Sequence, residues 1–443
     1  MEFITGVTKK DMLELGDLRK GDYIGKTIRL NGTIHSIRNM GDIAFILLRK
    51  REGLVQCVYE EGESQFHIKD LKENMTIEAE GVVETQNRAP HGLELRLKTV
   101  KVLSEPWEAM PIPINKWKLQ SNPETLLDLR PVSLRNIRER AKFKIQEGIV
   151  RGFRGFLCQE GFTEVRTPKI VSRGAEGGAN IFRLDYFHKK AELAQSPQFY
   201  KQTMVGVFDR VFEVGPVFRA EKHNTHRHLN EYTSMDLEMG FIESFDEIME
   251  METGILQYMM ELLRKEYADE LQILNVSLPN TDKIPQVRFE VAKKLVSEKY
   301  NRPIRIPYDL EPEEEQLISK YFKEEFDADF VFVTHYPSKK RPFYAMDDPG
   351  DNTVTLSFDL LFRGVEITTG GQRIHDYNKI CRKLESRGMS REGMESYLMI
   401  FKYGMPPHGG LGIGLERLTM KILNMDNVRE TTLFPRDLSR LEP

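Results

Sequence analysis

Residues 214–239 place a polar, cationic loop between two segments with strand character, and this arrangement restricts the fold more than any other feature of the chain. The first segment is rich in the β-branched and aromatic residues that suit a buried strand. The last segment alternates Met235, Leu237 and Met239 with polar residues, as a strand with one buried face does. The pattern predicts two sheet strands joined by a loop that could hold a polyanion.

Arg219 and Glu221 stand at the end of the first segment, and residues two apart in a strand face the same side. An arginine can grip a phosphate or a carboxylate through two parallel hydrogen bonds, and a carboxylate can accept one from an exocyclic amine such as that of adenine. A charged hairpin that is simply a solvated edge fits the stretch equally well. Zinc held by His223, His226 and His228 is disfavoured, because the three cysteines of the chain form no CxxC pair.

The composition is that of a globular protein with two or three domains: 443 residues, 40% hydrophobic and 30% charged. The net charge of −4 excludes a uniformly basic surface, so any nucleic-acid contact must come from local patches. The sequence shows no apolar stretch long enough to span a membrane and no secretory signal at its start. Together with three cysteines that form no obvious pairs, these features predict a reducing, cytoplasmic location.

Short strand-like segments separated by turn signals fill residues 1–105 and predict a small antiparallel barrel of the OB-fold type. Within it, Arg38 and Phe45 belong to a group of basic residues around an aromatic ring, the combination that binds single-stranded bases. An ordinary core position for Phe45 is the equally compatible alternative. Residues 106–135 are rich in proline and predict a linker or hinge, which leaves residues 136–443 as a second domain.

The second domain opens with a helical pattern that starts near Ser133. A glycine-rich loop at residues 172–178 is typical of a lid that closes over a ligand. Gln198 and Lys201 lie one helical turn apart and are expected to share a face. The acidic run at residues 311–315 predicts a solvated face or the start of a helix.

Asp359 and Glu366 are two carboxylates in an otherwise apolar strand pattern. Buried carboxylates need a partner. A magnesium ion that bridges phosphates would provide one, because Mg²⁺ in proteins is usually held by one or two carboxylates together with substrate phosphates. The two residues are therefore predicted to form a metal site.

Three parts of the chain together resemble the signature motifs of class II aminoacyl-tRNA synthetases. They are residues 161–168, residues 214–239 around the sequence FRAE, and residues 410–417, GLGIGLER. They occur in order behind a barrel, and the resemblance covers nearly the whole chain. Within the class, the segments QSPQFYKQ, RGVEITTGGQRIHDY and LFPRDLSRLEP resemble aspartyl-tRNA synthetases of the archaeal and eukaryotic type.

The resemblance implies an α+β fold, with an antiparallel sheet flanked by helices and an N-terminal OB-fold that binds the anticodon. It also implies a reaction that uses ATP and Mg²⁺. The carboxylate of L-aspartate attacks the α-phosphorus of ATP, pyrophosphate leaves, and the terminal ribose hydroxyl of tRNA attacks the aspartyl-adenylate. Such a reaction depends on positioning and charge neutralisation and needs no enzyme nucleophile. The family is generally a homodimer joined through the first motif.

The same resemblance assigns roles to residues of the second domain. The residues implied for ATP are Arg219 (α-phosphate and reacting carboxylate), Glu221 (adenine amine), Tyr232 (adenine face), Arg227 and His228 (β- and γ-phosphates), Gly414, Arg417 (other adenine face and γ-phosphate) and Glu366, with Arg219, Arg417 and Glu366 as the catalytic group. Those implied for Mg²⁺ are Asp359, Glu366 and Thr369. Those implied for aspartate are Glu176, Ser196, Gln198 and Asp236 around the ammonium group, Lys201 and Arg373 on the side-chain carboxylate, and Arg341 and Thr369 nearby. Two cations that converge on one pocket favour aspartate over asparagine, because an uncompensated buried cation is costly.

For the anticodon, the resemblance implies contacts from His35, Arg38, Phe45, Gln56 and Pro90. Relatives that discriminate tRNA-Asp from tRNA-Asn tend to carry Trp and Lys where this chain has His35 and Pro90, and proline has no side-chain donor. We therefore expect a non-discriminating enzyme that aspartylates both tRNAs and is coupled to an amidotransferase. The alternative is that His35 is a surface turn residue and Pro90 a loop residue.

Other functions remain open at this point. A synthetase specific for tRNA-Asp and an asparaginyl-tRNA synthetase are the nearest alternatives. A paralogue that makes asparagine without tRNA would have no use for the barrel. A non-catalytic RNA-binding protein would be expected to lack Arg219, Glu366 or Arg417, and all three are present.

Overall fold

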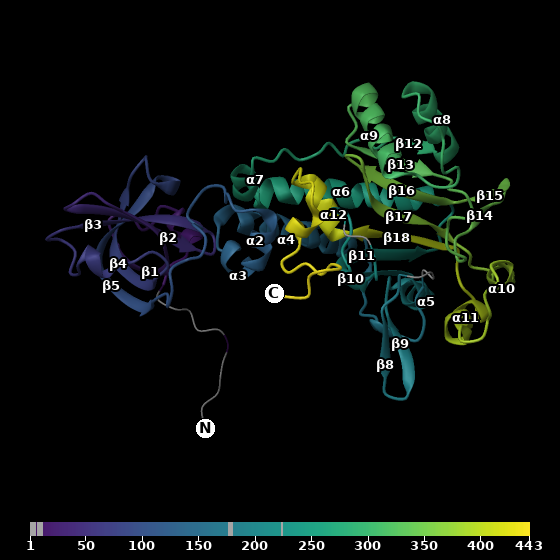
Figure 1. Cartoon of the computed structure of the whole chain (residues 1–443), viewed down its shortest axis with the longest axis horizontal. Coiled ribbons are helices and arrows are strands. Elements are labelled where there is room, and N and C mark those ends of the chain that lie inside the picture. Colours follow the sequence, from purple (N-terminus) through teal and green to yellow (C-terminus); the bar gives the residue numbers. More distant parts are fainter. Residues whose placement is uncertain (1–5, 7–11, 176–179, 223–224) are drawn as a thin grey trace. The chain divides into compact units, whose positions relative to one another are not determined.

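The computed structural model describes residue 6 and residues 12–175, 180–222 and 225–443. The chain forms two compact units, unit 1 (Met1–Ile137) and unit 2 (Arg138–Pro443) (Figure 1). Within the described residues no helix is both long enough and apolar enough to cross a membrane.

Unit 1 contains a closed five-stranded barrel with the strand order β1-β2-β3-β5-β4, so the expected OB-type barrel is confirmed. The strands are β1 (Thr27–Asn39), β2 (Ile43–Lys50), β3 (Gly53–Glu60), β4 (Thr76–Thr85) and β5 (Leu93–Ser104), with the short helices α1 (Leu15–Leu18), α2 (Pro123–Asp128) and α3 (Arg130–Ser133) outside it. Alternate strand residues such as Leu30, Ile46 and Leu48 are fully buried and fill the barrel. Residues 105–122 contain neither helix nor strand.

Unit 2 is built on an eight-stranded sheet with the order β12-β13-β16-β17-β18-β11-β10-β6 (Figure 1). The strands are β12 (Gln286–Arg288), β13 (Phe330–Thr334), β16 (Ser357–Phe362), β17 (Val365–Arg373), β18 (His408–Gly414), β11 (Glu231–Gly240), β10 (Arg210–Phe218) and β6 (Thr163–Glu164). The central pairs are antiparallel, as expected, whereas the outermost pairs β12–β13 and β10–β6 are parallel. The sheet is therefore mixed, with an antiparallel centre.

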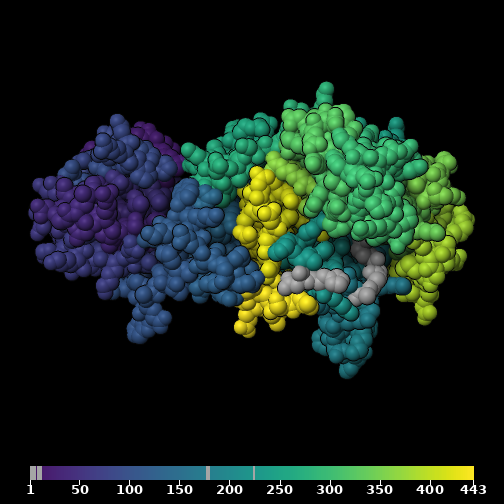
Figure 2. Space-filling view, turned by 45° about the horizontal axis from the view of Figure 1, so that its top comes forward, coloured from purple at the N-terminus to yellow at the C-terminus, as the bar shows by residue number. Residues whose placement is uncertain are grey.

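Helices surround this sheet and complete the α+β fold. They are α4 (Ile137–Gln159), α5 (Gln198–Phe208), α6 (Asp246–Glu266), α7 (Ala268–Leu274), α8 (Phe289–Lys299), α9 (Pro312–Phe326), α10 (Tyr377–Ser386), α11 (Glu395–Lys402) and α12 (Leu415–Ile422). The small strands β7 (Ile170–Val171), β8 (Arg183–Tyr186) and β9 (Lys189–Leu193) form a separate sheet, and β14 (Asp347–Asp348) pairs with β15 (Asp351–Thr355). The first long helix begins at Ile137 rather than near Ser133, because residues 130–133 form the separate turn α3. The C-terminal residues, yellow in Figure 2, lie on the surface of unit 2, where Glu430 pairs with Lys142 of α4 at 3.3 Å.

The main core lies between one face of the sheet and the helices α4 and α6. Strand β11 shows how the sequence divides the two faces: Met235, Leu237 and Met239 enter this core, while Asp236 and Glu238 point to the opposite face. The alternation expected from the sequence is confirmed. It leaves a row of charged side chains on the face away from α4 and α6.

The glycines of β18 make room for that charged row. A Cβ atom at Gly410 would lie 2.2 Å from Oε2 of Glu238, and one at Gly412 would lie 3.0 Å from Oδ1 of Asp236. Strand β18 is paired with β11, so these glycines lie directly beside the carboxylates of their neighbour. The run GGLGIG therefore serves the packing of buried charges, with Leu411 in the core on the other face.

Candidate active site

A cavity of about 720 Å³ opens on the charged face of the sheet in unit 2. It is lined by residues from α5, α9, β11, β16, β17, β18 and α12 and from the loops between them. Every described residue of this unit that the sequence resemblance singled out lines this cavity: Ser196, Gln198, Lys201, Arg219, Glu221, Arg227, His228, Tyr232, Asp236, Arg341, Asp359, Glu366, Thr369, Arg373, Gly414 and Arg417. Glu176 and His223 lie outside the described residues.

Arg219 and Glu221 follow strand β10 at one end of the cavity. The backbone N–H of Arg219 donates to the carbonyl of Asn230 at 2.9 Å, which joins the two sides of the hairpin beyond the strands. Its guanidinium lies 5.9 Å from the ring centre of Tyr232. The carboxylate of Glu221 accepts from Nδ2 of Asn180 at 2.9 Å. A cation, an aromatic face and an oriented acceptor are thus held together.

Arg417, in the first turn of α12, ties this end to strand β17. Its Nη1 donates to the carbonyl of Glu366 at 3.1 Å and its Nε donates to the carbonyl of Arg227 at 3.3 Å. His228 is half-buried nearby. Burial, together with the charge of Arg417, lowers the pKa of its imidazole below the usual value. This histidine is therefore a neutral hydrogen-bonding group at pH 7.

Asp359 and Glu366 lie on two paired strands, β16 and β17, and not on one strand as the linear pattern suggested. Burial raises the pKa of Asp359 to about 6. Burial also opposes ionisation of Glu366, but the charges of Arg417 and Arg341 lower its pKa below the usual value. Arg341 forms an ion pair with Asp359, with Nη2 2.7 Å from Oδ1. A predicted metal ligand is therefore paired with an arginine.

The donor set fits Mg²⁺. Thr369 donates its hydroxyl to Oε1 of Glu366 at 3.1 Å and is the register partner of Asp359, so two carboxylates and one hydroxyl converge. The described residues contain no cluster of three His, Cys, Asp or Glu side chains placed around one ion. Mg²⁺ does not need such a cage, because it keeps several waters and shares its other positions with phosphate oxygens.

The other end of the cavity is a compact cluster of buried charges. Nζ of Lys201 lies 2.9 Å from Oδ1 of Asp236 and 3.3 Å from Oε2 of Glu238, and it donates to the carbonyl of Leu411 at 2.8 Å. Nε of Arg373 lies 2.9 Å from Oε1 of Glu238. The two cations are therefore already paired, and the premise that they form an uncompensated positive pocket is wrong.

Glu238 is a residue that the sequence reasoning missed. Its side chain is fully buried, and although burial opposes ionisation, Arg373 and Lys201 lower its pKa below the usual value. The signal was present, since Glu238 stands two residues after Asp236 in a strand and must share its face. Near it, Oδ2 of Asp236 and Nε2 of Gln198 are buried without a hydrogen-bond partner among the described residues.

Helix α9 also reaches the cavity, through Glu315. The acidic run at residues 311–315 does start this helix, with Pro312 as its first residue and a capping box between Glu311 and Glu314. The alternative of a solvated face is wrong for Glu314 and Glu315, which are buried. A local charge run does not reveal that basic residues of other elements face it.

In unit 1, Arg38 and Phe45 are directly opposite each other in the β1–β2 pairing and so lie on one face of the barrel. Phe45 is partly exposed and is not a member of the barrel core. Nε2 of Gln56 donates to Glu94 at 2.8 Å. His35 lies at a bulge of β1 with 5% of its surface exposed, so its interpretation as a surface turn residue is wrong. Pro90 begins a short 3-10 turn before β5.

Two family descriptions match the chain. Residues 122–438 match the tRNA synthetases of class II (D, K and N), and residues 28–103 match the OB-fold nucleic acid binding domain. The chain therefore belongs to the class II tRNA synthetases.

Individual proteins and solved structures show which members of this class the chain is similar to. The chain is 48% identical over 425 residues to the aspartate–tRNA(Asp/Asn) ligase of Deinococcus radiodurans, covering 95% of this chain and 96% of that protein. It is 46% identical over 422 residues to the aspartate–tRNA(Asp/Asn) ligase of Thermus thermophilus, covering 95% and 98%. Among solved structures it is similar to the asparaginyl-tRNA synthetase from Pyrococcus horikoshii complexed with asparaginyl-adenylate, at 32% identity and a TM-score of 0.87, covering 95% and 97%.

Proposed function

We propose that the protein is a non-discriminating aspartyl-tRNA synthetase, which activates L-aspartate with ATP and transfers it to both tRNA-Asp and tRNA-Asn. The proposal rests on the observation that the residues assigned to ATP and the described residues assigned to aspartate line one and the same cavity. The aspartate–tRNA(Asp/Asn) ligases at 46–48% identity support the choice of aspartate and of two tRNAs.

In this proposal the nucleotide end holds ATP by contacts on all sides. Tyr232 and Arg417 enclose the adenine, and Glu221 accepts from its amine. Arg219 binds the α-phosphate, where negative charge develops as the aspartate carboxylate attacks. Arg227 and the neutral His228 bind the β- and γ-phosphates, with Gly414 beside them. These side chains line the cavity from the loop between β10 and β11, from β11 and from α12, so the phosphates would be fixed in line with the attacking carboxylate.

Asp359, Glu366 and Thr369 would hold Mg²⁺ together with phosphate oxygens, which would neutralise charge on the pyrophosphate as it leaves. Arg341 pairs with Asp359. We propose that it keeps this carboxylate ionised and oriented, and that it reaches aspartate only at the edge of the amino-acid site. In this proposal, Arg341 serves both the metal site and the amino-acid site.

The amino-acid end would select aspartate by donor geometry. Lys201 and Arg373 carry only hydrogen-bond donors, which match a carboxylate and meet the NH₂ group of asparagine poorly. The unpartnered Oδ2 of Asp236, with Ser196 and Gln198, would receive the ammonium group. Glu176 is included in this set by resemblance.

The barrel would bind the anticodon as unstacked bases, with Phe45 as the stacking ring and Arg38 and Gln56 beside it. His35 and Pro90 would leave the third anticodon position without the contacts that separate tRNA-Asp from tRNA-Asn. An amidotransferase would then convert aspartyl-tRNA-Asn. A homodimer joined through motif 1, which includes the edge strand β6, and a cytoplasmic location, supported by the free cysteines Cys57, Cys158 and Cys381, complete the proposal.

The test is charging with radiolabelled aspartate, using purified protein and separate transcripts of tRNA-Asp and tRNA-Asn. Comparable charging of both transcripts is expected. Charging of tRNA-Asp alone would refute the non-discriminating part and leave aspartate activation standing. Absence of aspartate-dependent ATP–pyrophosphate exchange would refute the enzyme itself.

A further inference from the structure

Helix α9 supplies a carboxylate to the nucleotide end of the cavity from a part of the chain that the motifs do not include. One carboxylate oxygen of Glu315, Oε2, pairs with Nη2 of Arg227 and accepts from the backbone N–H of Glu366 at 3.2 Å. Glu315 has 7% of its surface exposed. It therefore joins the loop after β10 to the β16–β17 hairpin.

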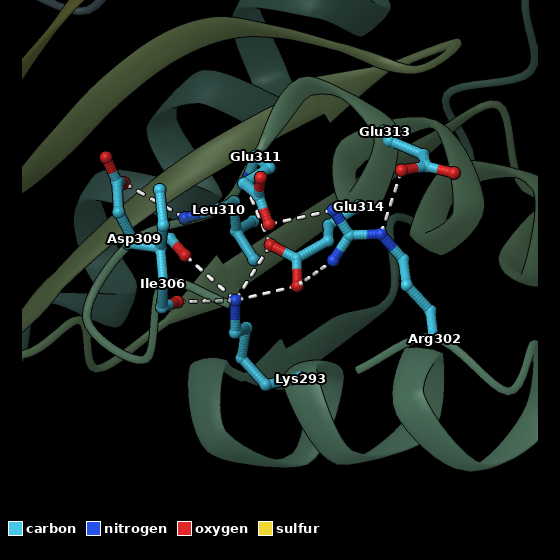
Figure 3. A network of polar contacts seen from close by, with 8 residues as sticks. All are labelled: Lys293, Arg302, Ile306, Asp309, Leu310, Glu311, Glu313 and Glu314. Carbon is cyan, nitrogen blue, oxygen red and sulfur yellow. Dashed lines mark hydrogen bonds and ion pairs between the residues drawn. The ribbon is translucent and has the colours of Figure 1, made fainter. Parts of the chain in front are cut away.

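The segment that carries Glu315 is fixed by its own ion network, shown in Figure 3. Nζ of Lys293, on α8, donates to both carboxylate oxygens of Glu314 at 2.7 Å and to the carbonyls of Ile306 and Asp309 at 2.8 and 3.0 Å. Arg302 reaches the carboxylates of Glu311, Glu313 and Glu314 at 2.8 to 3.0 Å. The first turn of α9 thus has a defined position, and Glu315 with it.

Arg227 has a donor left over for a ligand. Its ion pair with Glu315 uses Nη2, while its Nε is buried without a hydrogen-bond partner among the described residues. A guanidinium offers five N–H donors, so one contact to Glu315 does not use them up. A residue that competed with phosphate would occupy more of these donors, whereas one that aligns the arginine leaves them available.

We propose that Glu315 is a positioning residue for ATP: it holds Arg227 against Glu366 before the nucleotide arrives, and the α8–α9 segment is thereby part of the nucleotide site. The inference rests on the proposed role of Arg227 at the β- and γ-phosphates. Without Glu315 the long arginine side chain is free to adopt many rotamers, and ATP binding must then fix one of them.

The test measures nucleotide binding directly by calorimetry, with Mg²⁺ present and without aspartate or tRNA. Glu315→Ala is expected to raise the Kd for ATP about three- to tenfold, which is the usual cost of immobilising one flexible side chain. The Kd for AMP, which has no β- or γ-phosphate, should not change. The matched control is Glu325→Ala near the other end of the same helix, which breaks an ion pair with Lys299 at 2.6 Å but lies outside the network that fixes Glu315, and should bind ATP normally.

A double-variant cycle decides whether the effect passes through Arg227. In the Arg227→Ala background, Glu315→Ala should add nothing further to the Kd for ATP. Tighter ATP binding by Glu315→Ala would show competition and overturn the proposal. So would an unchanged Kd, an equal loss of AMP affinity, or a full additional effect in the Arg227→Ala background. Failure of the proposed synthetase function would appear separately, as absent aspartate-dependent exchange by a parent protein that binds ATP.

Discussion

Replacing Arg373 by alanine removes one cation from a cluster of almost fully buried charges. Arg373 is 6% exposed, its Nε lies 2.9 Å from Oε1 of Glu238, and its Nη2 donates to the carbonyl of Gly410 at 2.9 Å. After the change, the fully buried Glu238 still pairs with Lys201, whose Nζ lies 3.3 Å from Oε2 of Glu238. Breaking a buried ion pair by removal of one partner costs about 3–5 kcal/mol of unfolding free energy.

Two assays should respond to Arg373→Ala. Urea unfolding at pH 7 should show the loss of about 3–5 kcal/mol. In ATP–pyrophosphate exchange, kcat/KM for aspartate should fall about 10²- to 10³-fold, since a desolvated charge contact is worth a few kcal/mol and each tenfold is about 1.4 kcal/mol. ATP binding should be retained. The control is Arg363→Ala, which removes a less buried pair with Asp329 at 3.2 Å and should lower the free energy of unfolding less than Arg373→Ala does.

The pH dependence gives a further check on the same variant. The folded-state pKa of Glu238 lies below its usual value of 4.5, so its stabilising contribution is present above that pH and is lost as the pH falls through the folded-state pKa. The stability gap between the parent and Arg373→Ala should therefore narrow in acid. Equal destabilisation by Arg373→Ala and Arg363→Ala, or unaltered aspartate kinetics, would refute the reasoning.

Three other changes separate structural from functional roles. Burial raises the pKa of Glu252 to about 8, so the contribution of its neutral form to stability is fully present below pH 4.5 and is lost as the pH rises. Relative to Glu252→Gln, the parent should lose about 3 kcal/mol of unfolding free energy between pH 4.5 and 7. Parallel plots of unfolding free energy against pH for the two proteins would contradict this. Phe45→Ala should lower kcat/KM for tRNA about 10- to 100-fold in charging assays and leave aspartate-dependent exchange intact, as expected for one lost base stack of about 1–3 kcal/mol. Asp359→Asn should raise the Mg²⁺ concentration needed for exchange by about tenfold or more, and an unshifted Mg²⁺ titration would remove Asp359 from the metal site.

Much of the fold followed from periodicity. The barrel and the hairpin of β10 and β11 are encoded locally, by strand alternation and turn residues, so the sequence alone was enough to expect them. The parallel edge pairs β12–β13 and β10–β6 were not foreseen, because no local pattern records which distant segment a short edge strand joins.

In the candidate site, the resemblance to class II synthetases was sufficient to select side chains that line one cavity, but not to pair them. The partner of Arg227 lies 88 residues away, and the acidic run that contains Glu315 looks like any exposed helix start. Arg341 was expected beside aspartate, and its ion pair with Asp359 was not foreseen, since a sequence gives charge but not the rotamer. Glu238 was passed over although its spacing from Asp236 placed it on the same face.

The four charges at the amino-acid end, Lys201, Arg373, Asp236 and Glu238, sum to zero. A neutral group of this kind projects little field beyond its own walls, so it cannot draw anions in from solution. Recognition there would begin only on contact, once the carboxylate of a side chain of the right length can accept hydrogen bonds from the N–H groups of Lys201 and Arg373. The long-range attraction for charged substrates would then fall to the arginines at the nucleotide end, and the order in which the two substrates arrive would follow from that division.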